Sequence, residues 1–407
     1  MVYARALYSL FSSLRLTVWL LAAALVLVFF GTLDQVHLGI FVAQEKYFQS
    51  IIAIWGYPAQ WPLGEYLRHV HLPIPGGYLV GFMMLANLGC AHFRYFKHRW
   101  SNAGIVLIHL GLVMLILSEL ITNIVREENY LWFEEGQIAH HVTSYHEDEL
   151  VIIDRSHPEK DRVVSFPANP LRAGASLAHP ELPFRVLVRS FHENATISRG
   201  GAHQPRIATR GLAVSMNLTA QPQPRTFAMN ERNTTTAVVE LISPEGSLGS
   251  WLVSNVLENG LPHQDFEYGG RQYRIALRYK REYLPFSMKL IEFSHDRYPG
   301  TNIARNFSSR VHLVHPEAGE DRETLIYMNN PLRYGGYTFY QSSFGPDSQG
   351  RDDRASQLQV VNNPGWLVPY IACILMTLGM TWQFGYGLRR YVSRRASGNG
   401  TVQGGAA

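Results

Sequence analysis

The sequence predicts an integral membrane protein with four transmembrane α-helices and a large extracytoplasmic antiparallel β-rich domain. Three observations support this fold class: apolar runs of bilayer length, basic clusters beside those runs, and many short alternating segments between the third run and the fourth. The runs are residues 16–33, 77–93, 104–125 and 366–386. A helix needs roughly 20 apolar residues to cross a bilayer core, and only a helix satisfies its backbone groups within one such segment.

Basic residues set the predicted orientation. They cluster before the first run, between the second and third runs, and after the fourth: Arg5 and Arg15; Arg94, Lys97, His98 and Arg99; and Arg389, Arg390, Arg394 and Arg395. Because cytoplasmic loops are enriched in Lys and Arg, both termini are expected in the cytoplasm of a bacterial-type cytoplasmic membrane. The net charge of +4 reports this multi-pass topology, and no nucleic-acid partner is expected.

The same signals predict the domain boundaries. Residues 1–125 hold three spans and an interfacial segment at about 38–62, residues 126–365 form the extracytoplasmic β-rich domain, residues 366–388 form the fourth span, and residues 389–407 form a basic cytoplasmic tail. The first run is expected to be a retained anchor, because its apolar part is long and no small-x-small cleavage site follows it. The interfacial segment has apolar pairs near helical spacing; a globular loop packed on the outer domain is the alternative.

Alternating apolar and charged residues predict β-strands in the outer domain. The clearest examples are FRVLVRSF, residues 184–191, and RQYRIALRYKREY, residues 271–283. In the second, one face of the predicted strand carries apolar residues and the other carries charged residues. The apolar face holds Tyr273, Ile275, Leu277 and Tyr279, and the charged face holds Arg274, Arg278 and Lys280. Many short strands without intervening amphipathic helices favour an antiparallel sandwich or a distorted barrel.

The cysteines exclude two kinds of chemistry. Cys90 and Cys373 both lie inside predicted spans, and the sequence has neither a C-x-x-C nor a C-x-x-C-H motif. The chain is therefore not expected to exchange disulfides or to carry a c-type haem. No phosphate loop, zinc-protease motif or nucleophile motif is present either, so a hydrolytic enzyme is poorly supported.

His109 is the main candidate site residue. It lies about six residues inside the third run, roughly 9 Å from the cytoplasmic end at the rise of a helix. Ionisable residues inside a membrane are costly and frequently functional, and a neutral imidazole there can ligate a metal, with haem iron the favoured choice. The alternative is a histidine that only hydrogen-bonds a neighbouring helix. Gly104 and Gly111 on the same run can admit a flat macrocycle or another helix.

Two further ionisable residues are weaker candidates. His92, at the cytoplasmic end of the second run, is a conceivable second iron ligand, although it is shallower than His109 by several ångströms and an interfacial histidine needs no special function. Glu119 lies ten residues beyond His109, about 15 Å along the helix, so it cannot share a first coordination shell with His109. It is expected to reach toward water, or to serve a proton path or pair with a partner's cation.

Three stretches resemble the ResB family, also called CcsB, of system II cytochrome c biogenesis proteins. They are LYSLFSSLRLTVWLLAAALVLVFFGTLDQV, the run AGIVLIHLGLVMLILSELI around His109, and the pair LPFSMKLIEFSHDRYPGTNIARNFSSRVHL and IYMNNPLRYGGYTFYQSSFGPD. The PLRYGGYTFYQSSF block is the strongest of these. Its Arg333 can contact a haem propionate, but packing of the β domain near the fourth span explains the block equally well.

The resemblance implies a specific role. Proteins of this family are subunits of a membrane complex that exports haem and attaches it to apocytochrome c, acting with a CcsA- or ResC-like protein that has a tryptophan-rich haem-binding loop. By this resemblance His109 ligates haem b, held transiently and shared with the partner, and the outer domain positions apocytochrome c or a thioredoxin-like thiol reductant. Trp55 and Trp61 form no tryptophan-rich loop, so the chain is expected to be the unfused subunit, non-catalytic alone within a holocytochrome c synthase complex.

Two other function classes remain open from the residues alone. One is a membrane b-type cytochrome that moves electrons through haem held by His92 and His109. The other is a non-catalytic receptor or scaffold with a β-rich outer domain. Haem that is reduced by quinol would favour the first, and a purified chain without haem under any condition would favour the second.

Overall fold

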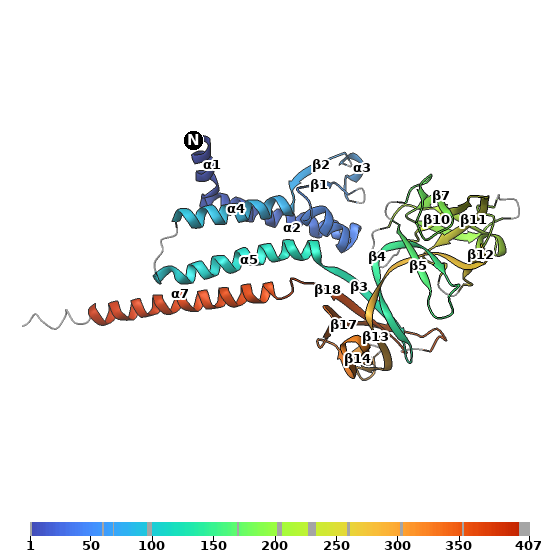
Figure 1. Ribbon diagram of the computed structural model, residues 1–407. Helices are drawn as coiled ribbons and strands as arrows, with labels where there is room; N and C mark the ends of the chain where they lie inside the picture. The colour runs from blue at the N-terminus through green and yellow to red at the C-terminus, as the bar shows by residue number, and fades with distance from the viewer. Residues whose placement is uncertain are drawn as a thin grey trace, which may run out of the picture. The chain divides into compact units, whose positions relative to one another are not determined.

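The computed structural model describes residues 2–58, 61–67, 69–95, 100–168, 171–201, 206–226, 233–258, 261–301, 304–351 and 354–398. The chain divides into two compact units, coloured by residue number in Figure 1. The helical unit holds residues 1–126 and 363–407, and the β unit holds residues 127–226 and 231–362.

Five helices of ten or more residues build the helical unit: α1 (Val2–Phe11), α2 (Leu14–Ala43), α4 (Gly77–Tyr95), α5 (Ala103–Val125) and α7 (Val368–Gly398). Helices α2, α4, α5 and α7 run side by side (Figure 1). Among the described residues, three segments are long and apolar enough to cross a membrane: Leu14–Ile40, Trp100–Val125 and Val368–Ala396.

The second predicted span forms the 19-residue helix α4, which is not among the helices apolar enough to cross a membrane. Asn87, His92 and Arg94 lower its hydropathy. Within the described residues three helices thus meet the length and hydropathy of a membrane span, and the fourth crossing remains a prediction.

The segment predicted to be interfacial has mixed structure. α2 continues to Ala43 with a non-helical residue at Gly39, followed by the π-helix η1 (Gln44–Phe48). Strand β1 (Ile52–Gly56) then pairs with β2 (His71–Pro75), and the short helix α3 (Gly64–Leu67) lies between them. The helical spacing expected for this segment therefore ends at Phe48.

Asp34 ties the end of α2 to η1. Its carboxylate accepts hydrogen bonds from Lys46 Nζ at 2.6 Å and from Tyr47 Oη at 2.7 Å. Asp34 and Tyr47 are both buried. Burying a carboxylate is costly unless it is paired and hydrogen-bonded, and here one ammonium and one hydroxyl supply both conditions.

Asn87 holds α4 against the break between α1 and α2. Its Nδ2 donates to the carbonyls of Phe11 at 2.7 Å and Ser13 at 3.1 Å, and its Oδ1 accepts from Thr17 Oγ1 at 2.6 Å. The last carbonyls of a helix have no partner within it. One buried amide therefore supplies a donor to the Phe11 carbonyl and links α4 to Ser13 and Thr17 at the start of α2, and this explains a polar residue inside an apolar helix.

We expect Asn87→Leu to destabilise the helical unit, because the carbonyl of Phe11 loses its donor and that of Ser13 keeps only the N–H groups of Leu16 and Thr17. An unsatisfied buried group costs about 1–3 kcal/mol. Thermal unfolding in detergent measures the loss, and Thr17→Val is the matched control, since it removes only the donor to Oδ1 and should cost less. Equal unfolding temperatures for Asn87→Leu and the wild type would contradict this role.

The β unit consists mainly of antiparallel strands. They are β3 (Glu127–Glu134), β4 (Ile138–Asp154), β5 (Arg162–Pro167), β6 (Ser176–Leu177), β7 (Arg185–His192), β8 (Ala195–Arg199), β9 (Leu218–Pro222), β10 (Thr236–Ser243), β11 (Gly246–Ser254), β12 (Gln264–Tyr268), β13 (Arg271–Arg297), β14 (Ala304–His315), β15 (Glu320–Tyr327), β16 (Leu332–Tyr334), β17 (Tyr337–Gly345) and β18 (Ala355–Asn362). The principal sheet has the order β15-β14-β13-β4-β3-β18-β17-β16, with β5 and β12 paired beside it. A four-stranded sheet has the order β11-β10-β7-β6, and β8 pairs with β9. The short helix α6 (Leu212–Ser215) precedes β9.

The long strands β4 and β13 pass through two separate hydrophobic cores. Val142 and Met288 belong to the first core, whereas Ile152 and Ile275 belong to the second. The predicted apolar face is confirmed for Tyr273, Ile275 and Leu277, which are buried in the second core. Beyond them the alternation ends, because Tyr279 is only half-buried and Arg278, predicted on the charged face, is buried. Two paired strands thus join the cores, and between the cores they carry polar residues.

A buried ion pair lies in this connecting region. Arg278 Nε donates to Glu149 Oε1 at 2.8 Å, and the two side chains are only 7% and 6% exposed. Close by, the half-buried His141 has a lowered pKa of about 4, mainly because burial disfavours its charged form and also because Arg281 repels it. The ring is therefore neutral at pH 7.

We expect the β unit to lose stability as the pH falls from 6.5 to 4. The unfolded chain protonates His141 near pH 6.5 and the folded chain only near pH 4, so the unfolded state binds more protons in this window. His141→Phe should flatten this part of the profile, as measured by β-sheet circular dichroism during thermal unfolding. Near pH 8 the ring is neutral in both the folded and the unfolded state. The difference in unfolding temperature between His141→Phe and the wild type should therefore be independent of pH in that range. An unchanged slope below pH 6.5 in His141→Phe would rule out His141 as the source.

Candidate functional site

The site centres on His109, which α5 presents from its first half. His109 Nδ1 lies 2.7 Å from the backbone carbonyl oxygen of Ile105, one turn earlier. A carbonyl can only accept a hydrogen bond, so Nδ1 carries the proton and donates. In the neutral ring the lone pair is therefore on Nε2, which is the state required of a metal ligand.

His92 on α4 lies directly beside this ring. The centroids of the His92 and His109 rings are 5.8 Å apart, and the ring planes are inclined by 55°. The predicted difference in depth is compensated by side-chain direction, because helical side chains lean toward the N-terminus of their own helix. α4 and α5 run in opposite directions, so the two imidazoles lean toward each other.

The donor set fits haem iron or a similar metal in part. Imidazole–metal bonds are about 2 Å long, so two rings on one ion would have centres roughly 6 Å apart. The separation of His92 and His109 agrees with this value. Within the described residues no group of three or more His, Cys, Asp or Glu side chains could hold a metal ion. Haem iron takes one or two axial imidazoles, and the spacing of this pair is compatible with that number.

Gly104 and Gly111 serve helix packing. A Cβ added at Gly104 would lie 2.4 Å from the carbonyl oxygen of Gly379, and one at Gly111 would lie 2.7 Å from that of Ala372. Both glycines thus let α7 approach the backbone of α5 closely. Of the two uses that the sequence allowed, contact with another helix is the one observed. Ile108 also lies at the contact between α5 and α7, close to Gly379. Because consecutive helical residues are offset by about 100°, His109 faces away from this contact.

The remaining candidate residues are on several elements. Glu119 is exposed on α5. Arg333 is exposed on β16. Cys90 and Cys373 are free thiols on α4 and α7.

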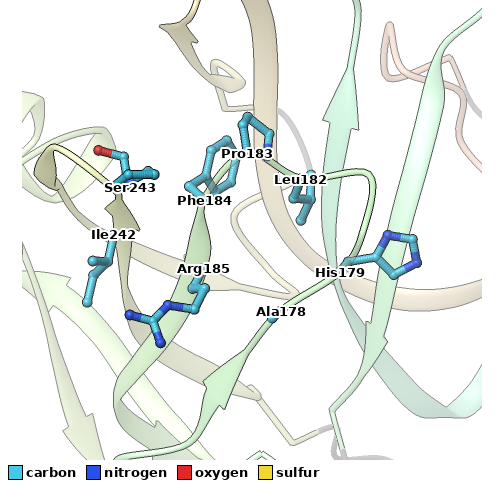
Figure 2. A pocket seen from close by; sticks show the side chains of 9 residues that line it. Ala178, His179, Leu182, Pro183, Phe184, Arg185, Ile242 and Ser243 are labelled. Carbon is cyan, nitrogen blue, oxygen red and sulfur yellow. The ribbon is translucent and has the colours of Figure 1, made fainter.

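A shallow pocket of about 280 Å³ lies in the β unit (Figure 2). Its lining includes His179, Phe184, Arg185 and Ser243. Figure 2 shows the His179 ring and the Arg185 guanidinium turned in different directions, so the polar groups do not converge on one point. A catalytic site requires polar groups that converge on one point, so this pocket does not have the geometry of a catalytic site.

Sequence reasoning missed the partner that orients His109. The carbonyl of Ile105 lies four residues before the histidine, so i−4 spacing within a helix could have identified it. It also gave no role to His140 and His141, because the pairing of β4 with β13 that surrounds them with arginines is not visible in the sequence.

The fold and the site together define a class of protein. Its members combine apolar helices that carry a pair of histidines with an antiparallel β unit that has two hydrophobic cores. Comparison with known proteins narrows the class. Residues 271–351, which run from β13 to the loop after β17, match the ResB-like family. The chain is also 39% identical over 99 residues to the protein NrfI of Wolinella succinogenes, and this match covers 24% of the chain and 10% of NrfI.

Residues 271–351 are therefore similar to the ResB-like family. The matched stretch contains the PLRYGGYTFYQSSF block, where the sequence resemblance was strongest. The resemblance is confirmed, although the family match covers a shorter part of the chain than the sequence resemblance suggested. The helices that carry His92 and His109 lie outside the matched residues.

Proposed function

We propose that this chain is a membrane subunit of the machinery that matures cytochromes c, and that His109 ligates haem b shared with a second membrane protein. The hydrogen bond from His109 Nδ1 to the Ile105 carbonyl carries this proposal, because it directs the lone pair of the ring to Nε2. The ResB-like match supports the cytochrome c role. Neither of these observations concerns the partner, which follows from the family resemblance alone.

Each part of the chain has a defined task in this proposal. His109 holds the iron through Nε2, and the close packing of α5 on α7 keeps its helix in place. Bound haem supplies the vinyl carbons to which the thiols of apocytochrome c add. The chain has only two cysteines, both on apolar helices and both free, so a separate thioredoxin-like protein must keep those thiols reduced. The β unit positions the apocytochrome, and a CcsA- or ResC-like partner provides the tryptophan-rich haem surface.

His92 gives the chain a second imidazole for the same iron. Its 5.8 Å separation from His109 also favours a second candidate function, a b-type cytochrome in which both histidines ligate haem within one chain and electrons pass through it. The two functions differ in what the cell loses: cytochrome c maturation in the first case, quinol-linked electron transfer in the second.

We expect His109→Ala to abolish cytochrome c maturation in cells that also produce the partner subunit. Added imidazole should restore part of it by occupying the vacant ligand position. Haem staining of covalently attached cytochromes c measures the result, and His312→Ala on β14 is the control, since that side chain pairs with Asp321 in the β unit. Normal maturation with His109→Ala would exclude His109 from the mechanism. Normal maturation combined with lost quinol-dependent haem reduction would instead support the b-type cytochrome.

A further inference from the structure

Besides the His109 site, a second group of polar side chains lies where β4 and β13 connect the two cores of the β unit. The register of this ladder shifts between Tyr279 and Arg281 and again between Tyr283 and Met288. Between the shifts Arg281 pairs with Thr143, and Tyr283 pairs with His141. Directly paired residues share a face of the sheet, and alternate residues do so too. Arg281, Tyr283 and His141 therefore lie on one face. We call Arg278, Arg281, His140, His141 and Tyr283 the waist cluster.

The waist cluster has an excess of positive charge. Glu149 pairs with the buried Arg278, whose Nη2 also lies 3.4 Å from Tyr283 Oη. The half-buried guanidinium of Arg281 has no acidic side chain within 4 Å among the described residues, and Glu258 and Glu149 act on it only at longer range. Burial and the nearby Arg278 lower the pKa of Arg281. Arg278 is thus paired with Glu149, whereas the guanidinium of Arg281 has no carboxylate in direct contact among the described residues.

The cluster also contains an unused polar atom and an exposed pair of flat rings. His141 Nδ1 is buried without a hydrogen-bond partner. The rings of His140 and Tyr283 stack at 5.7 Å and 26°, and Tyr283 is 50% exposed. Burying an unpaired charge and an unsatisfied nitrogen together is costly, so the arrangement is suited to a ligand that supplies an anionic oxygen.

We propose that the waist cluster binds a propionate of a porphyrin, with Arg281 and His141 on the carboxylate and the His140–Tyr283 pair against the macrocycle. The choice of a porphyrin rests on the proposed function. A guanidinium grips a carboxylate through two parallel hydrogen bonds, and stacked aromatic rings offer a flat surface to a flat ligand. An acidic peptide would use the guanidinium but not the flat rings, so the porphyrin is favoured.

The test uses the full chain in detergent and metal-free protoporphyrin, which His109 cannot ligate because it has no iron. Fluorescence titration compares protoporphyrin with its dimethyl ester, in which both propionates are blocked. The wild type should bind the free acid about tenfold or more tightly than the ester, since a hydrogen-bonded charge pair is lost. Arg281→Gln should remove most of this difference, and Arg281→Lys should keep part of it.

Controls separate this site from other charges on β13 and from misfolding. Arg271→Gln, on the same strand but paired with Asp154 at 3.5 Å, should behave as the wild type. Unfolding temperatures identify variants that do not fold, and Arg281→Lys covers the case in which Arg281→Gln fails. Equal affinity for acid and ester in the wild type would overturn the proposal. Protoporphyrin binding that is unchanged in Arg281→Gln would also overturn the proposal, even if that variant weakened the binding of apocytochrome c.

Discussion

The hydrogen bond between His109 Nδ1 and the Ile105 carbonyl is the interaction on which the account of the helical unit depends. It fixes the tautomer of the ring and limits its rotation, so that Nε2 is the nitrogen left with a lone pair. The glycine contacts of α5 with α7 set the rotation of the helix about its axis. Together these backbone contacts keep an imidazole available inside an apolar helix, where an uncommitted ring would turn to satisfy its own polar atoms.

The β unit depends on a different constraint, the length of β4 and β13. Two cores joined by one pair of strands need a polar region between them, and Arg278 with Glu149 fills it at the cost of desolvating both charges. In some proteins a buried ion pair is retained because it contributes to recognition or specificity. Binding of a ligand by the waist cluster would be such a role in this chain. The two proposed sites also differ in their chemistry: two imidazoles can ligate a metal, whereas the guanidinium of the waist cluster can bind a carboxylate.

Much of the fold could be predicted because membrane helices and alternating strands have strong periodic signals. The four apolar runs all became helices, and the alternation around Tyr273 and Ile275 identified a buried face. The approach of His92 to His109 was underestimated, since depth along a helix ignores the lean of the side chain. The waist cluster could not be predicted at all, because it requires the register of two strands that are more than 100 residues apart.

The tautomer of His109 is the most direct test of the central claim. ¹⁵N NMR of the full chain in micelles, labelled at the histidine side chains, separates protonated from unprotonated ring nitrogens, and His109→Gln assigns the signals. We expect the proton on Nδ1 and a bare Nε2 in the absence of haem. A proton on Nε2 would contradict this expectation.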